Sequence, residues 1–146
     1  MNIETIKNRI ENLHPDIQPM FGIMTAQHMV EHLILTVKLS YGRIKIPDFE
    51  PNEKQLAQKQ ILIHSEILFP KGIKAPGLPD NLMDLRFPNL EVAKEELIKS
   101  ITDYHIAFEE NEFLTTTHPR FGKLTYEEWG KFHTKHFEHH FAQFGI

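Results

Sequence analysis

The sequence contains no cysteine among its 146 residues. Disulfide bonds, thiolate zinc sites and a cysteine nucleophile are therefore excluded. Any bound metal ion must be held by histidine or carboxylate side chains. A thiol that takes part in the chemistry must come from another molecule.

Long basic runs and long apolar runs are also missing. Lys and Arg are scattered and the formal net charge is −4, which leaves no electrostatic footprint for nucleic-acid binding. No apolar stretch approaches the ~20 residues of a membrane span, and residues 1–10 are too polar for a secretory signal. We expect a cytoplasmic protein without nucleic-acid or membrane partners, folded as one domain over residues 1–146.

Apolar residues recur at helical spacing in five segments. Thr25, Asn89 and Thr125 are typical N-caps, and Thr125 with Glu128 forms a capping box. The predicted helices cover residues 3–13, 25–42, 52–68, 89–112 and 125–144, and residues 113–123 are predicted to be a loop. No convincing strand is found, so the predicted fold class is all-α, a four-helix bundle with one short extra helix.

Residues 69–89, "FPKGIKAPGLPDNLMDLRFPN", contain six prolines and glycines that interrupt any regular element. A segment of this length without secondary structure is uncommon in a compact domain, and such segments are often functional. We expect a long crossover that can cover the mouth of a site.

Four of the ten histidines lie inside the last predicted helix, in the eight-residue stretch 133–140. On a helical wheel His140 lies about 40° and His133 about 60° from His136, on the face that carries Trp129. A solvated face would not carry the only tryptophan, so this face points inward, whereas Glu138 points to solvent with Lys131 and Lys135.

His136 and His140 are four residues apart, so their imidazoles stack one turn above the other and can grip one metal ion. The sequence "HFEHH" is not the HExxH protease motif, because its glutamate is one position too late. A di-iron carboxylate bundle needs two ExxH motifs, and Glu11 with His14 is the only match.

A third ligand can come from "TAQHMVEHLIL", which offers His28 and His32, also four residues apart. His32 lies deeper in its helix. Three neutral imidazoles with an open fourth position suit Zn, Ni, Mn or Fe, and water or substrate takes the open position.

The segment "HFEHHFAQ" resembles the last-helix signature of the DinB/YfiT-like superfamily of metalloenzymes: His136, then His140, then Gln143. The segment "VEHLIL" resembles the second-helix motif of the same superfamily, which implies that His32 rather than His28 is the first ligand. Residues 118–145, "HPRFGKLTYEEWGKFHTKHFEHHFAQFG", resemble a subgroup without an assigned function. The superfamily pattern has Arg-Gly where this chain has Phe141-Ala142.

The resemblance implies an antiparallel bundle, up-down-down-up, with a long crossover and often a homodimer. It also implies a divalent ion, Zn or Ni ahead of Mn or Fe, held by His32, His136 and His140. Members with known activity include S-transferases that use bacillithiol, mycothiol or glutathione, and a thiol-dependent isomerase. Such an ion lowers the pKa of a bound thiol or water.

Three hypotheses follow. The first is a metal-dependent enzyme, a thiol-dependent S-transferase or a hydrolase acting on a small molecule, with a low-molecular-weight thiol as cofactor. The second is a non-catalytic bundle that binds metal or a small ligand, with His133 as a fourth metal ligand. The third is a helical interaction domain with a histidine-rich core. The residues expected to shape the pocket are Trp129, His133, His28, Thr36 and the loop 118–122.

Overall fold

The computed structural model describes residues 1–72 and 81–146. Within them lie the helices α1 (Ile3–Glu11), α2 (Ala26–Ser40), α3 (Glu53–His64), α4 (Leu90–Glu110) and α5 (Tyr126–Phe144), and the strands β1 (Thr116–His118) and β2 (Gly122–Leu124). None of the helices in these residues is long and apolar enough to cross a membrane. The chain is thus mostly helical, with one small sheet.

The helices begin where the sequence predicts, because each has a side chain that accepts a hydrogen bond from its first turn. Thr25, Asn89 and Thr125 accept from the backbone N–H three residues later, which satisfies a donor that the helix itself leaves unpaired. Thr125 and Glu128 form the predicted capping box, and Gly145 ends α5 in the left-handed conformation.

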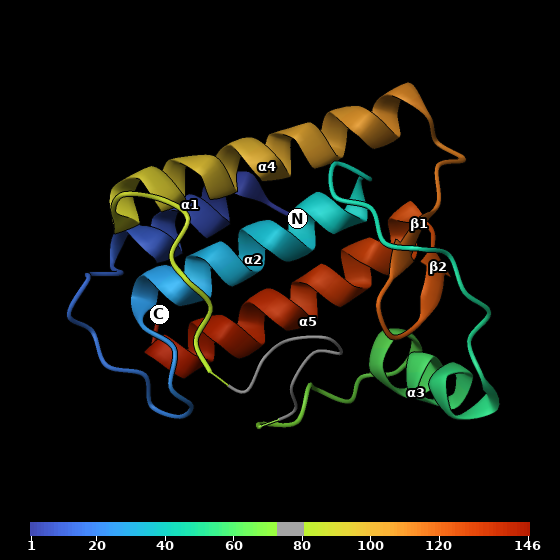
Figure 1. Ribbon diagram of the computed structural model, residues 1–146, viewed down its shortest axis with the longest axis horizontal. Coiled ribbons are helices and arrows are strands. Elements are labelled where there is room, and N and C mark those ends of the chain that lie inside the picture. Colours follow the sequence, from blue (N-terminus) through green and yellow to red (C-terminus); the bar gives the residue numbers. More distant parts are fainter. Residues whose placement is uncertain (73–80) are drawn as a thin grey trace.

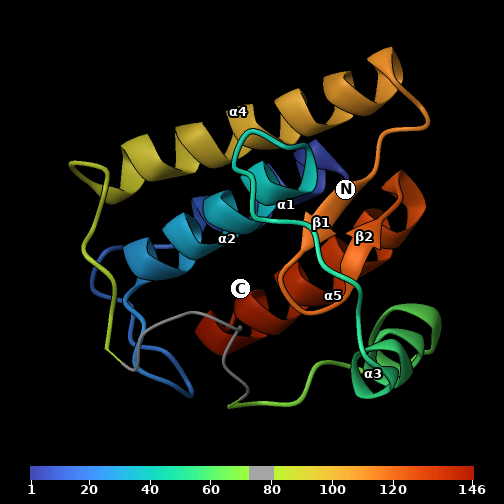
Figure 2. The same ribbon diagram turned by 45° about the vertical axis from the view of Figure 1, so that its right-hand side comes forward.

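Helices α1, α2, α4 and α5 lie alongside one another (Figure 1). The shorter α3 lies outside this group near the hairpin, where it packs against α5, and Figure 2 shows the same placement from another side. Helix α2 makes its most extensive contact with α4. Their shared core includes Met29, Leu33, Leu97 and Ile101, all fully buried, and burial of such side chains drives the packing.

Residues 113–123 do not form the predicted loop, and the expected all-α class is corrected accordingly. Thr116–His118 pairs antiparallel with Gly122–Leu124. β-branched threonines favour strands, and Gly122 has a φ of +70° and lies so close to Pro51 that a Cβ would clash. Thr116 joins this hairpin to two helices, because its hydroxyl donates to the Ser40 carbonyl and accepts from Trp129 Nε1, both at 2.8 Å.

Helix α3 ends at His64, four residues before the predicted end, and Lys135 binds backbone carbonyls on both sides of this end. The Lys135 ammonium donates to the carbonyls of Leu62 at 2.9 Å, Ser65, and Ile67 at 2.8 Å. The prediction that Lys135 points to solvent is therefore wrong. The ammonium holds the end of α3 and the start of the crossover against α5.

Lys135→Met is expected to lower the free energy of unfolding by about 2 kcal/mol, because three charge-assisted hydrogen bonds are lost while the apolar stem is kept. Lys131→Met is the matched control one turn earlier on α5. Its ammonium pairs with the exposed Glu127, and its loss should cost less than about 0.5 kcal/mol. Urea unfolding of both variants measures the difference; equal losses would show that the three carbonyl contacts are not stabilising.

The described parts of the crossover, residues 69–72 and 81–89, contain no helix or strand, as predicted. Residues 73–80 lie outside the described part of the chain. The expectation that the crossover covers the site therefore concerns, in part, residues that are not described.

Candidate metal centre

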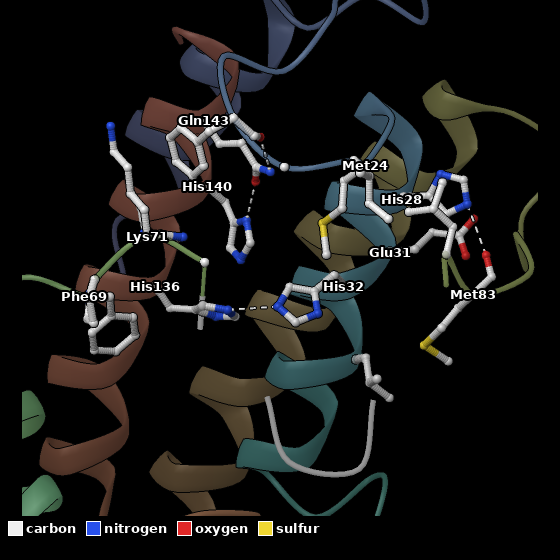
Figure 3. Close-up of a pocket in the computed structure, with 18 of the residues that line it drawn as sticks. Met24, His28, Glu31, His32, Phe69, Lys71, Met83, His136, His140 and Gln143 are labelled. Carbon is white, nitrogen blue, oxygen red and sulfur yellow. Dashed lines mark hydrogen bonds between the residues drawn. The ribbon is translucent and has the colours of Figure 1, made fainter. Parts of the chain in front are cut away.

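Three histidines from two helices converge where α2 faces α5. His32 comes from α2, His136 and His140 come from α5, and their candidate ligand atoms all lie within 4.8 Å of one another. The Nε2 atoms of His32 and His136 are 2.9 Å apart. Figure 3 shows the three rings turned toward one common point. The structure thus brings together the three residues that the sequence singled out as ligands.

The tautomer of His140 is fixed by Gln143. Gln143 Nε2 donates to the Phe21 carbonyl at 2.9 Å, which leaves its Oε1 as an acceptor for His140 Nδ1 at 2.9 Å. His140 Nδ1 must therefore carry the proton, and its Nε2 has a lone pair. That nitrogen points toward His32 and His136 (Figure 3). A ligating histidine is commonly oriented in this way by a hydrogen bond at its other nitrogen.

The geometry fits a divalent ion with little movement. At metal–nitrogen distances of ~2.0–2.1 Å, tetrahedral ligand nitrogens lie ~3.3 Å apart. The observed separations, from 2.9 Å up to 4.8 Å, bracket that value. In the part of the chain that the structure describes, the group contains no carboxylate or fourth histidine. The described residues thus offer three nitrogens, one fewer than a tetrahedral ion accepts.

All three imidazoles are in the neutral form that a metal requires. Burial lowers the pKa of His32 to about 4 and that of His140 to about 3. Burial, with His140 and His32 nearby, also holds the pKa of His136 well below its usual value. The Nδ1 atom of His136 is buried without a hydrogen-bond partner among the described residues. Its Nε2 lies 2.9 Å from Nε2 of His32.

A cavity of ≈ 560 Å³ opens next to the three histidines. This volume is in the range of small-molecule sites. Its apolar walls include the aromatic rings of Phe21, Phe69, Phe121 and Phe132. Phe69 comes from the crossover and lies 5.4 Å from Phe132, measured between ring centroids. The open side of the histidine cluster therefore faces a partly open, largely apolar space.

Glu31 and Arg86 also line the cavity and were not predicted as site residues. The Glu31 carboxylate is buried and accepts from the backbone N–H of Arg86 at 2.8 Å and of Phe87 at 3.1 Å. It also accepts from Gln27. Glu31 therefore anchors the crossover next to His32. Because its carboxylate already accepts these hydrogen bonds, Glu31 has a structural role and is not a general base.

Three of the residues expected to shape the pocket lie elsewhere. The Trp129 and His133 rings are stacked in the core, with centroids 5.4 Å apart, and neither lines the cavity. The Thr36 hydroxyl donates to the His32 carbonyl on the same helix and is also absent from the lining. His133 is outside the ligand cluster, so the suggestion of a fourth ligand at this position is corrected: two turns of α5 separate it from His140.

The other pocket residues are confirmed. His28 lines the cavity, with its Nε2 3.0 Å from the Met83 carbonyl. From the loop 118–122, His118, Arg120 and Phe121 line it. Glu138 is exposed, as predicted, and pairs with Arg9. Lys71 and Gly22 also line the cavity but were not predicted as site residues. Both lie in irregular segments, where no hydrophobic periodicity indicates which way a residue faces.

Gly22 supports the metal centre through Gln143. A Cβ on Gly22 would lie 2.8 Å from Gln143 Nε2, and its φ is +77°. The neighbouring Met20 N–H donates to the Gln143 backbone carbonyl at 2.7 Å. The segment 20–22 thus fits closely around the glutamine that orients His140.

Gly22→Ala is expected to raise the dissociation constant for zinc about 10- to 100-fold, the usual effect of losing an orienting partner. Gly72→Ala is the matched control, since Gly72 has a φ of +79° but none of the described residues lies within 4 Å of the added Cβ. Competition with a chromogenic chelator measures both constants. If both variants bind zinc like the wild type, Gln143 does not orient His140 in a way that matters for affinity.

Comparison of the chain with models of known families, with curated proteins and with solved structures gives no match. The functional argument therefore rests on the geometry of the site.

Proposed function

We propose that the protein is a divalent-metal-dependent enzyme acting on a small molecule, a thiol-dependent S-transferase or a hydrolase. His32, His136 and His140 would hold the ion, with zinc or nickel ahead of manganese or iron. The observation that carries the proposal is the convergence of three neutral imidazoles, one with its lone pair fixed by Gln143, on the floor of an apolar cavity.

The same proposal extends to the fold. The arrangement of α1, α2, α4 and α5 alongside one another, with the ligands on α2 and α5, is that expected of a DinB-like four-helix bundle. The crossover 69–89 would be the long connection of such a bundle. Solution of the structure by experiment, with helix axes and directions measured, tests this part directly.

The ion, when bound, would supply Lewis-acid activation of a water or thiol in the open position. The chain's own residues perform the remaining tasks. Gln143 holds the His140 ring, Glu31 and Lys135 hold the two ends of the crossover next to the ligand helices, and the aromatic walls exclude bulk water. Because the chain has no cysteine, a thiol nucleophile would bind from solution.

An open site favours chemistry and a closed site favours a structural role. Cobalt-substituted protein is expected to change its visible absorption when 2-mercaptoethanol or azide is added, because a new ligand enters the fourth position. A cobalt spectrum that does not respond to either would contradict the enzyme hypothesis and favour the non-catalytic metal-binding protein. An assay with glutathione and 1-chloro-2,4-dinitrobenzene then distinguishes transferase from hydrolase activity.

A further inference from the structure

The imidazole of His118 lines the cavity without belonging to the ligand cluster. It lies at the end of β1, and only 7 % of the residue is exposed. The His118 ring contacts Phe132 with centroids 4.6 Å apart, and the ligand His136 contacts the same phenyl ring with centroids 5.1 Å apart. His118 therefore lies one aromatic ring away from a residue of the metal centre.

The tautomer of His118 is set by the backbone of the hairpin. The Arg120 N–H donates to His118 Nδ1 at 3.0 Å, so this nitrogen has the lone pair and the proton is on Nε2. An imidazolium is incompatible with this hydrogen bond, because it carries a proton on both nitrogens. Burial agrees with the neutral form, since it lowers the pKa of His118 to about 3. His118 is thus a neutral ring with one N–H left to donate.

The Nε2–H of His118 has no acceptor among residues 1–72 and 81–146. The two nitrogens of His133 are also unpaired, but they are fully buried in the core, whereas His118 borders the cavity. A donor without a partner in largely apolar surroundings is unfavourable. An acceptor on a molecule that enters the cavity removes this cost.

The His118 ring is held in one orientation before any ligand binds. It stacks on Phe121 with centroids 4.6 Å apart and lies 5.3 Å from the Trp129 ring. The hairpin that carries it is fixed by Thr116, whose hydroxyl donates to the Ser40 carbonyl and accepts from Trp129 Nε1. Because the donor is preorganised, little conformational entropy is lost when a ligand accepts its hydrogen bond.

We infer that His118 contacts the substrate and donates its Nε2–H to a carbonyl oxygen of the molecule in the cavity. The apolar body of that molecule lies against the phenylalanine walls. A neutral imidazole in this position polarises the carbonyl group without changing its own charge. The inference names a substrate class for the proposed function, aromatic carbonyl compounds, and it rests on that function only for the part played by the ion.

Two ligands of one shape test the inference: 2-acetylnaphthalene, which has a carbonyl oxygen, and 2-isopropenylnaphthalene, in which a methylene group replaces that oxygen. Naphthalene fluorescence measures both dissociation constants. In His118→Phe, which keeps an aromatic ring and removes the donor, the constant for the ketone is expected to rise about three- to tenfold and that for the alkene to stay within about twofold. Equal changes for the two ligands, or a wild type that does not bind the ketone, would overturn the inference.

His118→Gln is the matched variant that keeps a donor. Its amide nitrogen can donate from nearly the same place as the imidazole Nε2, while its amide oxygen accepts from the Arg120 N–H. The ketone is therefore expected to bind His118→Gln more tightly than His118→Phe. Equally weak binding to both variants would contradict a role for the N–H and indicate that the shape of the ring matters instead.

Spectra of the wild-type protein test the same claim without a substitution in the core. Two-dimensional 1H–15N spectra of the imidazoles are expected to show His118 as the Nε2–H tautomer at neutral pH. The ketone should move this proton resonance downfield, and the alkene should not. A proton on Nδ1, or a resonance that the ketone leaves in place, would overturn the inference.

Every binding measurement is made on metal-free and on zinc-loaded protein, which separates the role of His118 from the proposed function. A loss of ketone affinity in His118→Phe in both forms supports the donor, even where a wild type that binds no zinc contradicts the metal-dependent function. If zinc raises the affinity for the ketone and His118→Phe lowers it in neither form, the ion alone holds the oxygen and the role of His118 is overturned.

Discussion

Zinc is expected to raise the midpoint of thermal unfolding of the wild-type protein by about 10 °C, and a chelator should reverse the shift. A ligand that binds only the folded state stabilises it by about 4 kcal/mol at a free concentration 1,000 times its dissociation constant. For a chain of this length each kcal/mol moves the midpoint by about 3 °C. Differential scanning calorimetry of metal-free and zinc-loaded protein measures the shift.

The zinc-dependent rise in the unfolding midpoint should require each of the three ligand histidines but not a neighbouring histidine. His32→Ala, His136→Ala and His140→Ala are each expected to abolish the zinc-dependent shift, because two imidazoles hold the ion far less tightly than three. His139→Ala is the control: His139 adjoins His140 and lines the cavity but is outside the ligand cluster. A His136→Ala protein that keeps the full shift would contradict the assignment.

Acid is expected to unfold the metal-free protein well above the pH at which most domains of this size fail. Burial lowers the pKa of both His118 and His133 to about 3, whereas the unfolded chain binds the same protons near pH 6.5. Their stabilising contribution is therefore complete above about pH 6.5 and is lost as the pH falls toward 3. By pH 4.5 protonation of the two histidines lowers the free energy of unfolding by about 5 kcal/mol, which is comparable to the whole stability of many domains.

The contribution of one histidine can be measured on its own. In His133→Leu the slope of unfolding free energy against pH should fall by about 1.4 kcal/mol per pH unit between pH 6 and 4. Near neutral pH this variant should be at least as stable as the wild type, since both buried nitrogens of His133 have no partner among the described residues. His14→Gln, at an exposed position, is the control. An unchanged slope in His133→Leu would show that this ring is protonated in the folded protein.

Much of the fold could be predicted because its signals are local. Caps at Thr25, Asn89 and Thr125 and helical periodicity predicted the helix starts to within one residue. The wheel of α5 predicted the inward direction of His136 and His140. Their meeting with His32 is a contact between helices distant in sequence. The prediction that they meet rested on the spacings His28/His32 and His136/His140 and on the family resemblance, and not on periodicity alone.

The features that were missed depend on tertiary contacts. Lys135 is charged and lies on a polar stretch of the helical wheel, yet its ammonium binds carbonyls that reach it only when α3 packs on α5. Glu31 is buried because the backbone of residues 86–87 supplies its donors. His133 shares the inward face of α5 with the ligands, but two helical turns separate it from His140, and it stacks on Trp129 in the core instead. No local sequence pattern predicts any of these three contacts.

Elemental analysis by mass spectrometry tests the central claim most directly. It requires tag-free wild-type protein and His136→Ala, each incubated with zinc, nickel and manganese and then freed of loosely bound ions. The three-histidine centre predicts close to one divalent ion per chain in the wild type and none in the variant. No ion in either protein, or the same amount in both, would show that His32, His136 and His140 form a hydrogen-bonded core and not a metal centre.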